Sequence, residues 1–169
     1  FLSAYIVLKT TKDRFHVSVL MLAGLSFAYI GLDDMTMFHE RLGFVVNNAL
    51  GLGGYNGESF NWLMYYAPCI AFALAIYYLL YTFFRRTHRL SGGLFLSGTI
   101  LWIGALVVEY GGGQLITQSV VNVPFYHLLI ILEEAFELCG ATLITMAFLK
   151  YTHYLTVRYV RFIANQKHL

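Results

Sequence analysis

Four long apolar runs constrain the fold of this chain more than any other feature of its sequence. They cover residues 16–32, 61–84, 90–108 and 125–149, and each is close to the roughly 20 residues that a helix needs to cross the hydrocarbon core of a bilayer. A shorter apolar run at 1–8 is too brief to span. The sequence therefore predicts an all-α, integral membrane helical bundle with four spanning helices and a partial helix at the N-terminal end.

Composition supports one membrane domain over the whole chain. Hydrophobic residues make up 59% and charged residues 12% of the 169 residues, whereas soluble domains have roughly 25% charged residues. We expect a single transmembrane domain at 1–169, with spans at about 16–40, 61–84, 90–109 and 125–150 and a basic tail at 151–169. The net charge of +2 is too small, and the basic residues too scattered, for nucleic-acid binding. The lipid bilayer is the expected partner.

The basic residues predict the orientation of the chain in the membrane. All Lys and Arg residues except Arg41 lie at one end of the predicted spans, and the positive-inside rule makes that end cytoplasmic. We expect a bacterial inner (plasma) membrane protein whose basic loops and C-terminus are cytoplasmic. The tail at 151–169 is then a helical extension on the anionic inner leaflet, and the glycine-rich segments 47–61 and 111–124 are outer loops.

Acidic residues gather at the opposite, outer end of the apolar runs. Counting about 1.5 Å per helical residue from the inner boundary places Asp33, Glu109 and Glu134 at roughly 26, 28 and 22 Å. Ionised carboxylates are costly near hydrocarbon unless they are paired, protonated, wet or bound to a cation, so this layer is a predicted site. Its candidate metal ligands are Asp33, His39, Glu40, Glu109, His127, Glu133, Glu134 and Glu137.

Helical spacing indicates which of these side chains share a face. Asp33 and Glu40 are seven residues apart and nearly eclipsed if the first helix continues that far, whereas Asp34 points about 100° away and is a weaker candidate. The candidates on the last helix span an arc of about 120°, so all of them can face one neighbouring helix. They are His127, Glu133, Glu134 and Glu137.

The charge balance of the acidic layer favours protonated carboxyl groups or one or two bound metal ions, because Arg41 is the one nearby Lys or Arg. Oxygen ligands with imidazole suit iron, manganese or zinc, in a mononuclear or dinuclear site, and oxygen ligands alone suit calcium or magnesium. Di-metal sites in helical bundles use Glu-x-x-His twice. This chain has Glu134-x-x-Glu137 and the pair His39-Glu40 instead, so the ligand identity stays open.

A purely interfacial location is an alternative for some of these acids. Four acids lie near enough to the membrane boundary for it, namely Asp33, Asp34, Glu40 and Glu109. Glu133 also fits an outward-facing acid stabilised by a helix N-terminus. Glu134 and Glu137, which are deepest in the predicted span, fit this alternative least well.

Two motifs carry a resemblance to other proteins. The stretch LDDMTMFHERLG at 32–43 and the stretch LEEAFELCGA at 132–141 resemble a group of uncharacterised bacterial multi-pass membrane proteins. Those proteins carry an acidic pair, a His-Glu pair and a Glu-Glu-x-x-Glu motif on separate helices, and more often have Asp-Glu in place of Asp33-Asp34. The resemblance covers most of the chain. It implies a shared buried site and no particular activity.

Three functional hypotheses follow from the sequence. The first is a membrane metalloprotein that could act as an oxidoreductase. The second is a non-catalytic accessory subunit of a larger respiratory, photosynthetic or oxygenase-like membrane complex. The third is a proton or cation pathway, although the inner halves of the predicted spans carry no acids that would continue such a path.

Overall fold

The computed structural model describes residues 14–49, 62–117 and 123–166, together with Ser3, Tyr5 and Val7. These residues are almost entirely helical, which confirms the predicted all-α class. The helices are α2 (Arg14–Thr36), α3 (Phe38–Ala49), α4 (Trp62–Thr87), α5 (Arg89–Thr117) and α6 (Val123–Gln166). Ser3, Tyr5 and Val7 are also helical and lie within the partial helix predicted at 1–8.

Among the described residues, three helices are long and apolar enough to cross a membrane, over Arg14–Asp33, Tyr65–Thr87 and Arg89–Gly113. The sequence predicted a fourth span at 125–150. The corresponding part of α6 is less apolar, because it carries three glutamates toward one end and Lys150 at the other. Only 17% to 28% of the residues in the three spans are buried inside the structure, so most of their apolar side chains face outward, as expected at a lipid contact.

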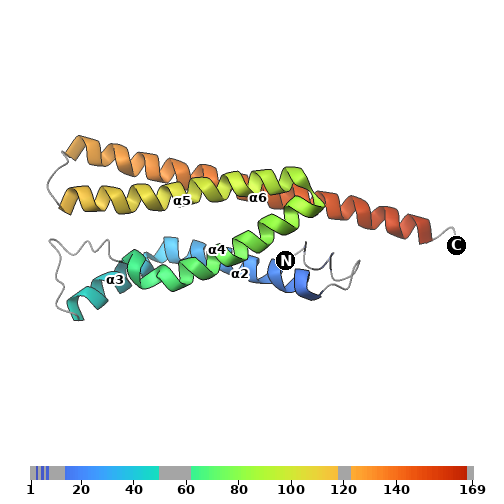
Figure 1. Ribbon diagram of the computed structural model, residues 1–169, viewed down its shortest axis with the longest axis horizontal. Coiled ribbons are helices and arrows are strands. Elements are labelled where there is room, and N and C mark those ends of the chain that lie inside the picture. The colour runs from blue at the N-terminus through green and yellow to red at the C-terminus, as the bar shows by residue number, and fades with distance from the viewer. Residues whose placement is uncertain are drawn as a thin grey trace.

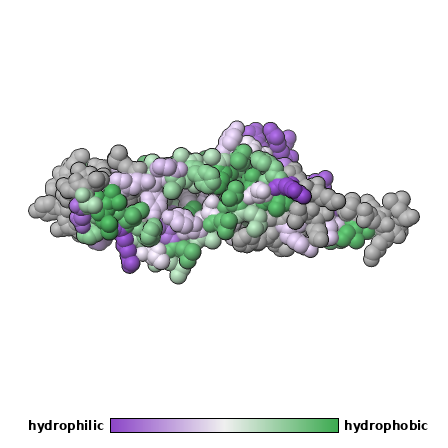
Figure 2. All heavy atoms as spheres, turned by 90° about the horizontal axis from the view of Figure 1, so that it is seen from below, coloured by the Kyte–Doolittle hydropathy of each residue, from purple (hydrophilic) through white to green (hydrophobic). Residues whose placement is uncertain are grey.

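Figure 1 shows how the helices are arranged. Helices α5 and α6 lie side by side along the length of α5, and this pair has the most extensive packing. Helix α4 runs obliquely and meets α5 where the two are joined, and α2 and α3 pack against α4. Helix α6 continues beyond the ends of the other helices. In Figure 2, strongly hydrophilic side chains gather at two places along the long axis, and the described side chains between them range from weakly polar to hydrophobic.

The packed core lies toward one end of the bundle, which we call the basic end because Arg14, Arg85, Arg86 and Arg89 lie there. Its buried side chains come from the first half of α2, the second half of α4 and the first half of α5. Helix α6 contributes Ile144, Ala147, Tyr151 and Leu155. The Ser3 and Thr152 hydroxyl oxygens are 2.6 Å apart, so Ser3 also contacts α6 at this end.

A single residue, His88, separates α4 from α5 and caps the first turn of α5. Its Nδ1 atom lies 2.8 Å from Ser91 Oγ and accepts the Ser91 amide at 3.4 Å, and its ring stacks on Tyr154 with centroids 5.2 Å apart. A side-chain acceptor at a helix start satisfies an amide that has no intrahelical partner. The turn is tight, as the space at Gly92 shows: a Cβ atom added there would lie 2.9 Å from the Arg85 amide nitrogen.

The first predicted span, 16–40, ends earlier than expected. Helix α2 stops at Thr36, and Met37 has φ of 49°, a left-handed conformation that non-glycine residues rarely adopt. Helix α3 starts at Phe38 and leaves in a different direction (Figure 1). Asp33 and Glu40 therefore lie on different helices, and their seven-residue spacing does not place them on one face.

The predicted outer loop at 111–124 is also shorter than expected. Helix α5 continues through Gly111, Gly112 and Gly113 to Thr117, and α6 begins at Val123. Gly112 and Gly113 are buried, and a Cβ atom on Gly112 would already touch Leu129 of α6 at 3.4 Å. The glycines thus allow close packing of two helices. Residues 118–122, and residues 50–61 of the other predicted outer loop, lie outside the described residues.

Candidate functional site

Glycine contacts hold α5 and α6 in register at the end opposite the core, which we call the acidic end because Asp33, Glu109 and Glu133 lie there. These contacts are Gly104 with Phe136 and Gly112 with Leu129. Glu109 lies between the two glycines along α5, and Glu133 lies between their two partners along α6. Because the helices run antiparallel, this register brings Glu109 and Glu133 to the same level.

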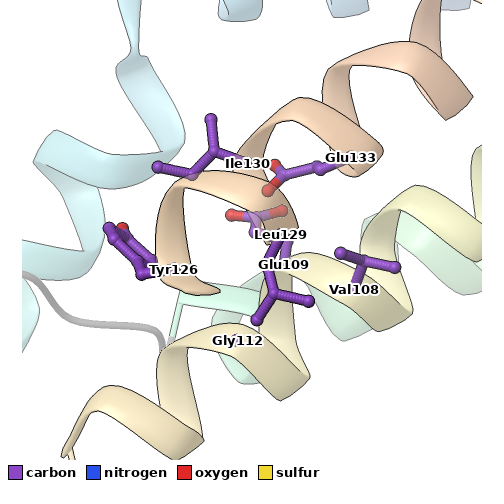
Figure 3. A pocket seen from close by; sticks show the side chains of 7 residues that line it. All are labelled: Val108, Glu109, Gly112, Tyr126, Leu129, Ile130 and Glu133. Atoms are coloured by element: carbon purple, nitrogen blue, oxygen red, sulfur yellow. The ribbon is translucent and has the colours of Figure 1, made fainter. Parts of the chain in front are cut away.

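Glu109 and Glu133 line one cavity of about 180 Å³ between α5 and α6. Figure 3 shows their carboxylate groups pointing toward one another, with the Tyr126 ring beside them. Both glutamates are half-buried. The remaining walls are formed by Val108, Gly112, Leu129 and Ile130. The site therefore combines two facing carboxylates with space for a small ion or water molecules.

The helical turn of about 100° per residue explains which candidates on α6 reach this cavity. Tyr126 and Glu133 are seven residues apart and share the face that packs on α5, and Glu137, one turn further, is also half-buried. His127 and Glu134 each follow one of these residues directly, so they point about 100° away. Both are exposed.

Asp33 has a different environment, between α2 and α4. It is half-buried and interacts electrostatically with Tyr66 of α4, whose hydroxyl accepts a hydrogen bond from Tyr29 at 3.4 Å. Within the described part of the chain, no three or more His, Cys, Asp or Glu side chains are grouped closely enough to hold a metal ion. Asp33 thus does not form such a group with Glu109 and Glu133. The side chains of Asp34, His39 and Glu40 lie outside the described residues.

The chemistry of the α5–α6 cavity follows from its donor atoms. Two carboxylates that face each other repel when both are ionised, so a shared proton or a cation between them lowers the energy of the pair. The side-chain donor atoms that line the cavity are all oxygen atoms. The imidazole of His127 is exposed and does not line the cavity. Magnesium ions commonly bind one or two carboxylates and keep several waters, and manganese also accepts oxygen ligands.

Comparisons with known proteins give one match. A family model described as "Domain of unknown function (DUF8692)" matches residues 1–151. The matched region contains both glutamates of the α5–α6 cavity. No curated protein and no solved structure matches the chain.

Proposed function

Because this chain belongs to the DUF8692 family over residues 1–151, and that family is described only as having unknown function, we propose a function from the residues themselves. The chain is a multi-pass membrane protein that binds a divalent cation between Glu109 and Glu133 at its acidic end. The observation that carries this proposal is the pair of facing carboxylates in a shared cavity.

Membrane insertion in the proposed topology includes α6 as a fourth span. Helix α6 lies beside α5 along the length of α5, and α5 is itself long and apolar enough to span. With 44 residues, α6 is about 66 Å long, more than twice the roughly 30 Å of a hydrocarbon core. The positive-inside rule places the basic end in the cytoplasm of a bacterial cell and the acidic end on the extracytoplasmic side.

A cation is favoured over a shared proton because of where the two glutamates lie. Burial and a neighbouring negative charge both favour the protonated form of a carboxyl group, and a bound cation relieves the second of these causes. Glu109 and Glu133 are only half-buried, and the proposed orientation places them near the outer membrane surface, where water and ions are available. Glu137, one turn along α6 from Glu133, is also half-buried but does not line the cavity.

Element analysis of the purified protein and three variants tests this proposal. We expect a stoichiometric divalent ion in the parent protein and its loss in Glu109→Gln and Glu133→Gln, because each change removes a charged ligand and preserves side-chain size. Glu134→Gln is the matched control, since Glu134 is adjacent in sequence but exposed. A chelator should lower the melting temperature of the parent and not that of Glu133→Gln, because an ion that binds only the folded state stabilises it by mass action.

Two outcomes would contradict the cation proposal. If the parent carries no ion and Glu133→Gln melts at or above the parent temperature, the two carboxyl groups share a proton, because glutamine mimics the neutral acid. If Glu134→Gln loses as much metal as Glu133→Gln, the ion lies elsewhere. The identity of the ion also decides whether the site supports redox chemistry, which iron or manganese would permit and zinc, calcium or magnesium would not.

A further inference from the structure

A second cavity, of about 160 Å³, lies between α4 and α5 toward the basic end. Its walls include Leu74, Tyr78 and Tyr81 of α4 and Phe95, Leu96 and Thr99 of α5. The Thr99 hydroxyl donates a hydrogen bond to the Phe95 carbonyl at 2.9 Å, so its polar group is satisfied within its own helix. Side chains at the mouth of this α4–α5 groove are exposed, with fractions of 42% for Leu74, 66% for Tyr78 and 40% for Leu96. The groove is therefore mostly apolar and open to the surroundings of the bundle.

A cationic side chain lies at the basic end of this groove. The Arg85 Nη1 atom donates a hydrogen bond to the Tyr81 hydroxyl at 3.2 Å, and its guanidinium carbon lies 5.9 Å from the centre of the Tyr81 ring. Arg85 is exposed, as are Arg86 and Arg89 around the tight α4–α5 turn. Positive charge is thus concentrated where the apolar groove ends.

We propose that the α4–α5 groove binds an anionic phospholipid of the inner leaflet, with its phosphate at Arg85 and an acyl chain along the groove. A phospholipid places its charged group at the membrane surface and its chains beneath it. Arg85, Tyr81 and Leu74 follow the same order along α4, with Arg85 and Tyr81 one turn, about 6 Å, apart. Guanidinium groups bind phosphate through paired, charge-assisted hydrogen bonds, and basic pockets between spanning helices are known to hold lipid head groups.

The charge and the surroundings of the groove both favour a lipid over a second protein chain. The groove opens between two helices that are apolar enough to span a membrane, so the bilayer is its immediate surroundings. The proposed cytoplasmic location of the basic end places Arg85 at the leaflet that carries anionic lipids. This inference is independent of the cation site, which lies at the other end of the bundle.

The test compares the full-length protein in nanodiscs of phosphatidylcholine alone and of phosphatidylcholine with phosphatidylglycerol. Retained lipid is measured by native mass spectrometry and melting temperature by fluorescence. We expect selective retention of phosphatidylglycerol and a higher melting temperature in its presence. Arg85→Gln should weaken this association roughly fivefold, the effect of removing one cationic side chain near an anionic lipid. Leu96→Trp, which fills the groove and keeps every charge, should weaken it as well.

Arg158→Gln is the matched control, because Arg158 is an exposed arginine on the projecting part of α6. Because the tail at 151–169 is itself expected to lie on the anionic inner leaflet, the loss of lipid retention in Arg158→Gln should be clearly smaller than that in Arg85→Gln. Equal losses in Arg85→Gln and Arg158→Gln would show diffuse electrostatic attraction and overturn the proposal. It would also be overturned by equal retention of the two lipids, by full retention in Leu96→Trp, or by inorganic phosphate in detergent raising the melting temperature as much as the lipid does.

Discussion

At the scale of single residues, the core contains one polar atom with unusual surroundings. Tyr77 of α4 is only 5% exposed, and its ring packs against Phe27, Phe95 and Trp102 with centroid distances of 5.6, 5.5 and 6.5 Å. Its hydroxyl oxygen is buried without a hydrogen-bond partner among the described residues. A buried hydroxyl in that state costs roughly 1 to 3 kcal/mol of stability, while the aromatic ring contributes packing.

We expect Tyr77→Phe to keep or raise the melting temperature of the protein, because it removes the hydroxyl and preserves the ring. The gain in stability should be about 1 kcal/mol or more, measured by thermal unfolding in detergent. Tyr66→Phe serves as the comparison, since the Tyr66 hydroxyl accepts a hydrogen bond from Tyr29 and its removal should lower the melting temperature. A clear loss of stability in Tyr77→Phe would mean that the hydroxyl has a partner in the membrane-embedded protein.

At the scale of elements, the pairing of α5 with α6 organises the acidic end. The two backbones approach closely where Gly98 faces Gly140: a Cβ atom on Gly98 would lie 2.7 Å from the Gly140 carbonyl oxygen, and one on Gly140 would lie 2.9 Å from the Gly98 oxygen. Small residues at such crossings let spanning helices pack closely. This contact and those of Gly104 and Gly112 fix the register that brings Glu109 level with Glu133.

Replacing Gly98 by alanine should therefore destabilise the protein by about 1 to 3 kcal/mol, the usual cost of overpacking a close contact. Gly93→Ala is a matched control in the same helix, because nothing lies within 4 Å of a Cβ atom at Gly93. That change should be neutral or slightly stabilising, since alanine favours helix over glycine by about 1 kcal/mol. Thermal unfolding of both variants measures the difference. Equal effects of the two changes would argue against the close α5–α6 crossing.

At the scale of the whole molecule, tight packing and candidate chemistry lie at opposite ends. The buried cluster gathers at the basic end, whereas Glu109 and Glu133 lie beyond it, where α5 and α6 pack mainly on each other (Figure 1). Binding regions are commonly drawn from the less stable parts of a fold. The separation leaves the proposed cation and lipid sites in different leaflets of the bilayer.

Single-cysteine labelling in intact cells tests this topology, using an impermeant thiol reagent after Cys69 and Cys139 are replaced. We expect labelling of Gly54→Cys, and protection of Thr87→Cys and Ala164→Cys until the membrane is permeabilised, because the proposed orientation places the basic end in the cytoplasm. Labelling of Ala164→Cys together with Gly54→Cys would show that α6 does not cross. Labelling of Thr87→Cys and protection of Gly54→Cys would invert the orientation.

The sequence alone determined the helical class, the three apolar spans in α2, α4 and α5, and the segregation of acids from bases, because hydropathy and charge are properties of each local segment. It did not determine the continuation of α5 through Gly112, because glycine is compatible with both loops and packed helices. It also did not determine the break at Met37, because non-glycine residues rarely adopt a left-handed conformation. Helical spacing grouped Glu133 with Glu134, and only the contact with α5 decided that Glu133 lines the cavity. Which side chains meet depends on helix register and crossing, which arise from contacts between residues far apart in the chain.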